Sequence, residues 1–337
     1  MRPATAVTPA LPLATAAIAA RDPEPVPVST EPLIRLVRDC SRDLPQVRPD
    51  DVIAAALQDV PAHASQDDLA LLVAEAAAAR VLDEPEYSQL AGRLLAARIA
   101  GEVAGLGIAR FSEAIAMSHR LGLIAEPTAS FVARHATPLD GAIKDARTDL
   151  FGYFGLRTVY DRYLLRHPEL RLVLETPQHF LLRVACGLAE TPEEAVQLYE
   201  LMSSLSYLPS TPTLFNSGTR HPQMSSCYLL DSPADDLEAI YRRYLDIAKL
   251  SKFAGGIGLA FHRVRSRGSL IRGTNGLSTG LVPWLKTLDS SVAAVNQGGK
   301  RKGTCAVYLE TWHADIEEFL ELRDNTGDPS RRAYNLN

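Results

Sequence analysis

The chain has 337 residues, 46% of them hydrophobic and 22% charged, a composition typical of a soluble globular protein with one large or two ordinary domains. Its formal net charge is −5, so the overall electrostatic field does not favour direct binding to nucleic acid. No run of roughly 18 apolar residues occurs, which excludes a membrane-spanning helix.

The four cysteines, Cys40, Cys186, Cys227 and Cys305, lie far apart in the sequence. Their spacing fits neither a disulfide scaffold nor a zinc site. The pattern is typical of a reducing compartment, and it predicts a cytoplasmic protein.

Residues 1–31 are rich in Pro, Ala, Thr and Val and show no periodicity, which predicts a disordered leader. The Ala-rich stretch near its start faintly resembles an export signal. Pro9 and Pro12 interrupt that stretch, so the favoured interpretation remains a leader without export.

From residue 32 to residue 205 the pattern favours a helical domain. Helices are predicted at 67–82, at 85–105 and at 110–121, the last ending at Gly122. The apolar faces predicted for the first two are Leu71, Leu72, Ala74, Ala78 and Val81, and Leu90, Leu94, Leu95, Ile99 and Val103.

Two helix starts are marked by a threonine followed by a proline. Thr176-Pro177 and Thr191-Pro192 each offer a capping hydroxyl and a proline suited to the first helical position. They predict helices at 177–187 and 192–204.

Beyond Pro209 short strand-like runs alternate with a helix and glycine-rich turns. Strands are predicted at 226–230, 257–261 and 306–309, and a helix at 236–253. This alternation indicates an α/β layer over residues 206–337.

The same region contains one cysteine beside two hydroxyls and three loops rich in glycine and basic residues. Ser225-Ser226-Cys227 comes first, and the loops at 254–258, 265–276 and 296–303 follow. Glycine lets backbone N–H groups approach an anion, and neighbouring arginine or lysine supplies charge, so these loops suit phosphorylated ligands.

Taken in order, these segments resemble the large (α) subunit of class I ribonucleotide reductase from Pro209 to Asn337. Weaker likenesses at 149–156 and 177–179 extend the resemblance back to roughly Asp67. The resemblance implies an α/β protein with a helical N-terminal domain followed by the first half of that family's ten-stranded α/β barrel.

The resemblance assigns Cys227 to the family's first redox cysteine, which closes to a disulfide as the ribose is reduced. An isolated cysteine would more simply be a small buried hydrophobe. Thr211, Ser226 and Gly256 match substrate contacts, although loop hydroxyls more often cap helices and turns. Cys40, Cys186 and Cys305 match no catalytic position and are interpreted as structural.

The loop at 265–276 matches the family's first specificity loop, and the loop at 296–303 matches its second. The resemblance implies effector contacts from Asp235, Asp236, Arg265 and Arg272. It also implies that Gln297 and Lys302 face the substrate base. The simpler alternative for these charges is a solvated surface.

His313 and Glu317 are spaced as metal ligands would be on one face of a predicted helix. No further side chain completes a site, so no metal is expected there.

The resemblance predicts a ribonucleoside-diphosphate reductase that makes deoxyribonucleotides for DNA synthesis. It implies ribonucleoside diphosphates as substrates, ATP or deoxynucleoside triphosphates as effectors, and thioredoxin or glutaredoxin as reductant. It also implies a homodimer of large subunits and a separate small (β) subunit carrying a di-metal radical cofactor.

No Asn-Leu-Cys-x-Glu segment with the family's radical cysteine occurs. We therefore expect the chain to be the N-terminal portion of a longer reductase and inactive alone. Two alternatives remain open, an inactive nucleotide-binding remnant and an adenosylcobalamin-dependent relative.

Overall fold

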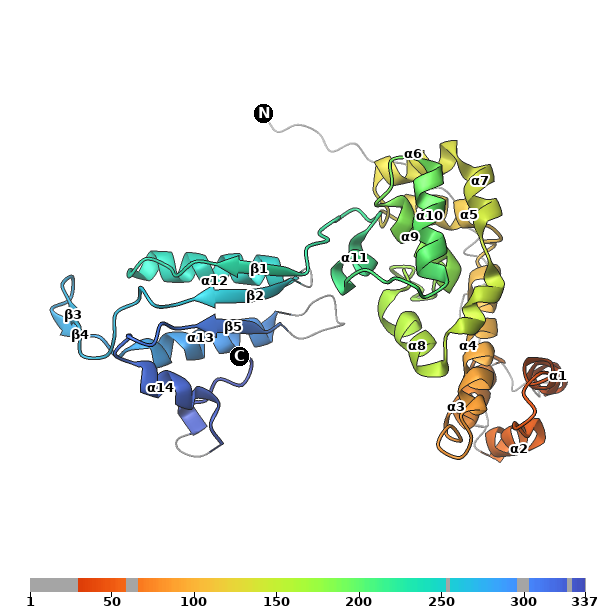
Figure 1. Cartoon of the computed structure of the whole chain (residues 1–337), viewed down its shortest axis with the longest axis horizontal. Helices are drawn as coiled ribbons and strands as arrows, with labels where there is room; N and C mark the ends of the chain where they lie inside the picture. Colours follow the sequence, from red (N-terminus) through yellow and green to blue (C-terminus); the bar gives the residue numbers. More distant parts are fainter. Residues whose placement is uncertain (1–29, 59–65, 253–254, 296–302, 326–328, 337) are drawn as a thin grey trace.

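The computed structural model describes residues 30–58, 66–252, 255–295, 303–325 and 329–336. Helices α1 to α11 form an all-helical part, and the chain from β1 onward forms an α/β part (Figure 1). The segment between α11 and β1 joins the two parts. Among the described residues, no helix combines the length and the apolar character that crossing a bilayer requires.

The helical part contains every helix predicted for it. The helices predicted at 67–82, 85–105, 110–121, 177–187 and 192–204 are confirmed as α3, α4, α5, α9 and α10, and the helices between α5 and α9 had no predicted counterpart. The bounds are α1 Glu31–Cys40, α2 Pro49–Gln58, α3 Gln66–Ala78, α4 Glu86–Gly105, α5 Phe111–Arg120, α6 Glu126–Arg134, α7 Ala136–Ala142, α8 Tyr153–Thr158, α9 Pro177–Cys186, α10 Pro192–Ser203 and α11 Thr211–Asn216. Short 3₁₀ and π turns at Asp145–Leu150 and Val159–Tyr163 flank α8.

The predicted helix ends have the geometry that their residues suggested. The Thr176 hydroxyl accepts a hydrogen bond from the His179 N–H at 3.2 Å, and the Thr191 hydroxyl accepts one from the Glu194 N–H at 3.2 Å. Gly122 follows α5 with a φ of 73°, a left-handed conformation that glycine adopts without strain.

The apolar face predicted for α4 is confirmed, because all five of its residues are buried. The face predicted for α3 is wrong in part. Leu71 and Leu72 are only half-buried. The residues of α3 in the core are Leu69, Val73, Ala74 and Ala77. Ala and Leu occur on nearly every side of α3, so its neighbours α2 and α4 decide which face is buried.

A buried ion pair ties the end of the helical part together. The Arg183 side chain on α9 is 0% exposed, and its guanidinium donates to both oxygens of Glu175 at 2.9 and 3.1 Å. It also donates to the Ser217 carbonyl at 2.8 Å. Glu175 accepts a further bond from the Leu165 N–H at 2.9 Å, so one charge pair joins several chain segments.

The backbone beside this pair is packed without room for a side chain. A Cβ on Gly187 would lie 2.2 Å from the Gly218 nitrogen. The helix α11 lies beyond the predicted domain boundary at 205/206, yet its Leu214 belongs to the helical core. The close approach therefore fixes the exit from the helical part toward β1.

The α/β part is built on a parallel sheet in the order β1–β2–β5. Helix α12 connects β1 to β2, and α13 lies on the connection from β2 to β5. Right-handed crossovers in a sheet that grows in one direction place both helices on the same face. The bounds are β1 Cys227–Leu230, α12 Leu237–Lys252, β2 Gly256–Ala260, α13 Leu281–Ala294 and β5 Cys305–Tyr308.

The sheet continues beyond β5. Leu336 forms a parallel bridge with Cys305, whose N–H donates to the Asn335 carbonyl at 3.3 Å. The predicted α/β layer is thus confirmed as a parallel sheet with helices on one face. A hairpin of β3 Leu270–Ile271 and β4 Gly276–Leu277, the helix α14 Ile316–Leu320 and 3₁₀ turns at Glu321–Arg323 and Pro329–Arg331 complete the described elements.

We predict that Glu175→Gln destabilises the protein by about 3–5 kcal/mol, because it leaves the buried Arg183 charge without its partner. Urea unfolding followed by circular dichroism measures the change. Arg35→Ala is the control, since Arg35 pairs with Glu31 at the surface with side chains 70% and 71% exposed. Equal unfolding midpoints for the two variants would contradict the prediction.

Candidate functional site

Cys227 begins β1 and exposes its thiol on the sheet face that α12 and α13 leave uncovered. Successive strand residues point to opposite faces, and Tyr228 and Leu230 pack on the side of α12. Leu229, on the same face as Cys227, is 85% exposed. The thiol is therefore accessible at the open face of the sheet.

The structure brings Ser226, Cys227 and Gly256 together. Cys227 and Gly256 are register partners, and the Gly256 N–H donates to the Ser226 carbonyl at 2.7 Å. A Cβ on Gly256 would lie 3.5 Å from the Cys227 sulfur. The missing side chain thus keeps space open beside the thiol.

The other cysteines are placed differently. Cys305 points to the helix-covered face, and burial raises the pKa of its thiol to about 12. Burial likewise raises the pKa of Cys186 to about 12, and it raises that of the partly buried Cys40. The opposite orientation of Cys305 rules it out as a direct partner of Cys227 in this sheet.

Thr211 is the first residue of α11, and its hydroxyl lies 3.2 Å from that of Tyr163. The same helix is hydrogen-bonded to the chain segment that precedes Cys227. Asn216 donates to the Gln223 carbonyl at 2.6 Å, and the Thr213 hydroxyl donates to the Met224 carbonyl at 3.3 Å. The helical part therefore positions the segment that precedes the exposed thiol.

The loop at 265–276, predicted to be the first specificity loop, contains the β3–β4 hairpin. Its base is fixed by Arg265, whose guanidinium donates to the Asp235 carboxylate at 2.7 Å, the Asp235 carbonyl at 3.0 Å and the Leu270 carbonyl at 3.0 Å. Asp235 also accepts a bond from the Arg265 N–H at 3.1 Å. These two residues form one unit, and much of their bonding capacity is already used within it.

A hollow of about 450 Å³ lies beside this hairpin. Arg272 is exposed at its edge and has no ion-pair partner in the part of the chain that the structure describes. The hollow combines this open cation with the backbone of a tight hairpin, an arrangement suited to a phosphorylated ligand. It is lined by Asp235, Arg265, Ser269, Leu270, Ile271, Arg272 and Gly273.

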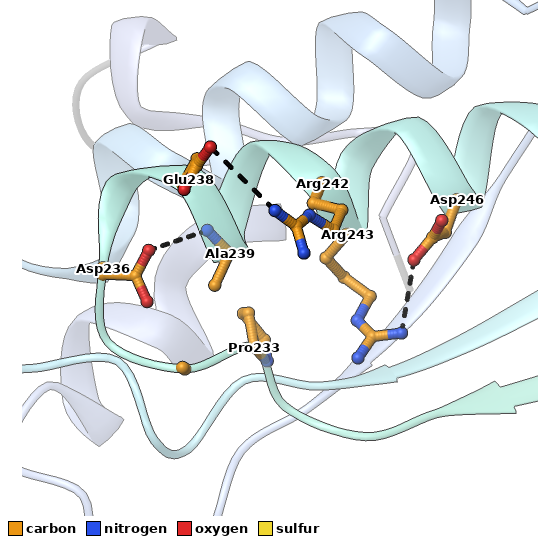
Figure 2. Close-up of a pocket in the computed structure, with 8 residues that line it drawn as sticks. Pro233, Asp236, Glu238, Ala239, Arg242, Arg243 and Asp246 are labelled. Carbon is orange, nitrogen blue, oxygen red and sulfur yellow. Dashed lines mark hydrogen bonds and ion pairs between the residues drawn. The ribbon is translucent and has the colours of Figure 1, made fainter.

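Asp236 does not line this hollow. Its carboxylate accepts the Ala239 N–H at 2.9 Å near the start of α12 and borders a separate hollow of about 260 Å³ (Figure 2). That hollow also carries Arg242, Arg243 and Asp246. The predicted effector residues therefore divide, with Asp235, Arg265 and Arg272 together and Asp236 apart.

Gln297 and Lys302, predicted in the second specificity loop, lie outside the described residues. Both flanks of that loop are described. A Cβ on Gly303 would lie 2.6 Å from the Val292 carbonyl oxygen, 2.8 Å from the Ser251 hydroxyl and 3.4 Å from the Val295 carbonyl oxygen. The two described flanks of the loop, Val295 and Gly303, therefore lie close together, against the ends of α12 and α13.

The helical placement predicted for His313 is wrong. His313 lies in the turn before α14, which begins at Ile316, so His313 and Glu317 do not share a helix face. Its ring is buried and bonded to the backbone. The turn geometry was hidden because Ala314 and Asp315 do not interrupt a helical pattern. Among the described residues, no cluster of three side chains suited to a metal ion occurs.

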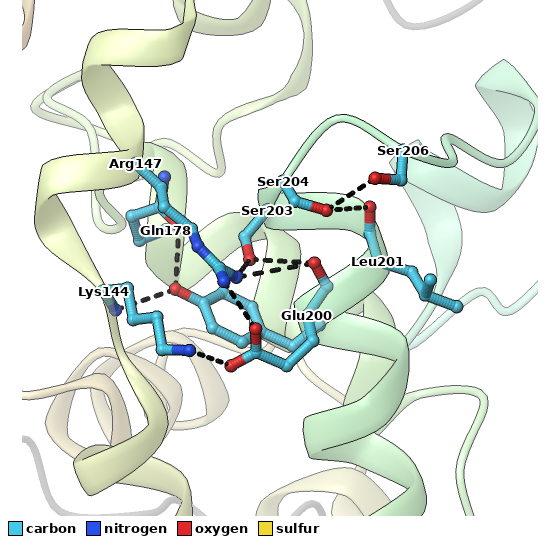
Figure 3. A network of polar contacts seen from close by, with 9 residues as sticks. Lys144, Arg147, Gln178, Glu200, Leu201, Ser203, Ser204 and Ser206 are labelled. Atoms are coloured by element: carbon cyan, nitrogen blue, oxygen red, sulfur yellow. Dashed lines mark hydrogen bonds and ion pairs between the residues drawn. The ribbon is translucent and has the colours of Figure 1, made fainter.

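A polar network in the helical part is structural (Figure 3). The Tyr199 hydroxyl donates to Gln178 at 2.8 Å and accepts the Lys144 N–H at 2.9 Å. The Arg147 guanidinium and the Lys144 ammonium both pair with Glu200. These groups satisfy one another and fix the segment after α7 against α10.

Two protein families match this chain in the same order as its two structural parts. The family described as ribonucleotide reductase, all-alpha domain matches residues 149–222, and the family described as ribonucleotide reductase, barrel domain matches residues 225–337. The chain belongs to the ribonucleotide reductase large-subunit family.

Similar proteins carry the corresponding names. A Chlamydia trachomatis ribonucleoside-diphosphate reductase subunit alpha is 42% identical over 324 residues, covering 90% of this chain and 30% of the relative. An Arabidopsis thaliana ribonucleoside-diphosphate reductase large subunit is 42% identical over 276 residues, covering 79% and 33%. A Neurospora crassa large chain is 41% identical over 280 residues, covering 81% and 30%. The chain thus spans about a third of the length of these relatives.

We predict that iodoacetamide labels Cys227 of this chain first under native conditions at pH 8. Alkylation needs an accessible thiolate, and a pKa of about 12 leaves Cys186 and Cys305 on the order of a thousandfold less ionised than an ordinary thiol. Peptide mass spectrometry over time measures the labelling. Cys227→Ser should remove the fastest modification, and faster labelling of Cys305 would contradict the assigned strand face.

Proposed function

We propose that this chain is the part of a ribonucleoside-diphosphate reductase large subunit that holds one redox cysteine and the effector site. The observation that carries the proposal is the exposed Cys227 thiol beside Gly256, in a chain whose two parts match the two reductase domains in order. The enzyme replaces the 2′-hydroxyl of a ribonucleoside diphosphate by hydrogen.

Cys227 supplies half of the reducing equivalents. The 2′-hydroxyl leaves as water, and two thiols give up two protons and two electrons as their sulfurs join in a disulfide. The second thiol comes from outside this chain, because Cys305 faces away from Cys227, Cys186 is buried in the helical core, and Cys40 packs against that core at the end of α1. Thioredoxin or glutaredoxin then reopens the disulfide by exchange.

The substrate lies along the open face of the sheet near Cys227. Thr211, Ser226 and Gly256 offer short polar or backbone contacts to it, and Gln297 and Lys302 contact its base. The support for this placement is the tight pairing of Ser226 with Gly256 and the anchoring of the preceding segment by α11. Bare backbone at Gly256 allows a nucleotide to approach closely.

A deoxynucleoside triphosphate or ATP occupies the hollow beside the β3–β4 hairpin as effector. Arg272 binds its phosphates, and the Arg265–Asp235 pair orients its phosphate and sugar. Asp236 acts from the start of α12, where its carboxylate already caps the helix. The exposed guanidinium of Arg272, next to the Arg265–Asp235 pair, supports the assignment.

The complete enzyme works with further components. Large subunits form a homodimer, and a separate small subunit carries the di-metal radical cofactor that starts the reaction. The protein is cytoplasmic, which the four free cysteines support. If activity requires this small subunit, and not adenosylcobalamin, the proposal is distinguished from its cobalamin-dependent alternative.

We predict that the chain binds dTTP and that Arg272→Ala weakens binding by about tenfold or more, because the variant removes an exposed cation that faces the phosphates. Titration calorimetry measures the affinity. Arg265→Ala should also weaken binding, since it releases Asp235 and the Leu270 carbonyl.

Arg263→Ala is the matched control for this titration. Arg263 is a neighbouring cation that pairs with Asp231 at 2.8 Å and does not line the hollow. It should bind dTTP as the wild type does. Equal heats for wild type, Arg265→Ala and Arg272→Ala would refute the effector assignment.

In an enzyme completed with the missing C-terminal portion and a small subunit, we predict that Cys227→Ser abolishes repeated turnover with a dithiol reductant. A serine hydroxyl has nearly the shape of the thiol but cannot form a disulfide. Formation of dCDP from CDP is the measurement, and dTTP affinity should be unchanged. Repeated turnover by the variant would show that Cys227 has another role.

A further inference from the structure

Two buried polar side chains hold the base of the first specificity loop, and both come from the turn between β5 and α14. His313 and Asp315 are each 5% exposed. Both bind backbone groups that flank the β3–β4 hairpin: His313 on the side before it, and Asp315 on both sides.

Asp315 joins the two ends of the hairpin segment. Its carboxylate accepts the Arg267 N–H at 2.9 and 3.2 Å, and it accepts the Leu281 N–H at 2.9 Å. Arg267 precedes the hairpin and Leu281 begins α13 after it. A carboxylate at the first turn of a helix also interacts favourably with the helix dipole. One side chain thus fixes the entry of the hairpin, its exit and the start of α13.

His313 fixes the residue before Arg265. Its Nδ1 accepts the Asp315 N–H at 3.1 Å, so the ring's proton lies on Nε2, which donates to the Val264 carbonyl at 2.8 Å. Val264 directly precedes the Arg265–Asp235 unit that borders the hollow. The ring therefore connects Asp315 to the effector-facing base of the loop.

Gly280 packs closely against Asp315 and Arg267. A Cβ on Gly280 would lie 2.7 Å from the Asp315 oxygen and 3.0 Å from the Arg267 Cβ. Gly280 also has a φ of 84°, which a residue with a side chain would adopt only under strain. The close approach of glycine lets the carboxylate reach both backbone N–H groups.

We propose that His313 and Asp315 are positioning residues of the effector site, which set the affinity for a nucleoside triphosphate by holding the hairpin base in its binding geometry. This inference rests on the proposed function, because it assumes that the hollow beside the hairpin binds the effector. The two residues act through the backbone of the first specificity loop and do not contact the ligand hollow themselves.

The test compares Asp315→Asn with Asp289→Asn in the full chain. Asp289 is a matched control because its carboxylate also accepts a backbone N–H, that of Asn335 at 2.7 Å, in the same α/β part but away from the hairpin. An asparagine at 315 replaces one acceptor oxygen by a donor, so one backbone N–H loses its partner. We expect the dTTP dissociation constant to rise on the order of tenfold for Asp315→Asn and to stay at the wild-type value for Asp289→Asn.

Thermal unfolding and amide hydrogen exchange separate positioning from general stability. Exchange of the Gly268 and Ser278 amides, which bond across the hairpin base, should accelerate in Asp315→Asn and remain slow in Asp289→Asn. His313→Gln gives a second variant, since glutamine can still donate to the Val264 carbonyl. It should weaken dTTP binding less than His313→Ala does.

Loss of dTTP affinity in Asp315→Asn that only matches the loss in Asp289→Asn would overturn the proposal. If Asp315→Asn does not fold, equal dTTP affinity of His313→Ala and wild type would overturn it as well. Absence of dTTP binding by the wild type would instead contradict the proposed function. In that case the amide exchange of the hairpin would still decide whether Asp315 holds the loop.

Discussion

The buried pairing of Arg183 with Glu175 is the constraint on which the positions of the other elements depend. Two opposite charges lie out of water, and each guanidinium nitrogen and each carboxylate oxygen has a hydrogen-bond partner, the Ser217 carbonyl and the Leu165 N–H among them. Such a pair is costly to desolvate and stabilising only when its geometry is complete. Here that geometry joins α9 to the chain leaving α11, and this chain leads to Cys227. The exposed Cys227 thiol is therefore placed by the helical part as well as by its own strand.

The sheet that carries Cys227 is covered on one face only among the described elements. Parallel sheets are ordinarily covered on both faces, so an uncovered face with an exposed thiol and a strip of glycine is a feature that function explains better than stability. Leu229 and Tyr308 flank Gly258, where a Cβ would come within 2.7 Å of Leu229. The large side chains of Leu229 on β1 and Tyr308 on β5 thus fit on this face because Gly258, on β2 between them, has no side chain.

Sequence patterns predicted the elements whose signals are local. Thr176 and Thr191 marked helix starts because capping depends on a few adjacent residues. The face of α3 was not predictable in this way, because neighbouring helices chose among several apolar sides. The bonds of His313 and Asp315 to the hairpin base gave no local signal, since their partners there lie more than 30 residues away in sequence. Asp235 and Asp236 are adjacent in sequence but border different hollows, and only the tertiary structure determines this.

The turn that holds the β3–β4 hairpin also follows directly on β5, and β5 follows the predicted second specificity loop. Gly303 is packed against Ser251 and the Val292 carbonyl with no space for a Cβ, so the start of β5 cannot slide without disturbing α12 and α13. At the other end of the strand, Asp315 and His313 bind the base of the hairpin. The strand β5 is thus closely packed at its start and followed by a turn that is hydrogen-bonded to the base of the hairpin. A displacement of the backbone at the hairpin base must therefore be taken up by the hairpin itself or be transmitted to β5. The hydrogen bonds between Arg265 and Asp235 leave the hairpin little conformational freedom to take it up.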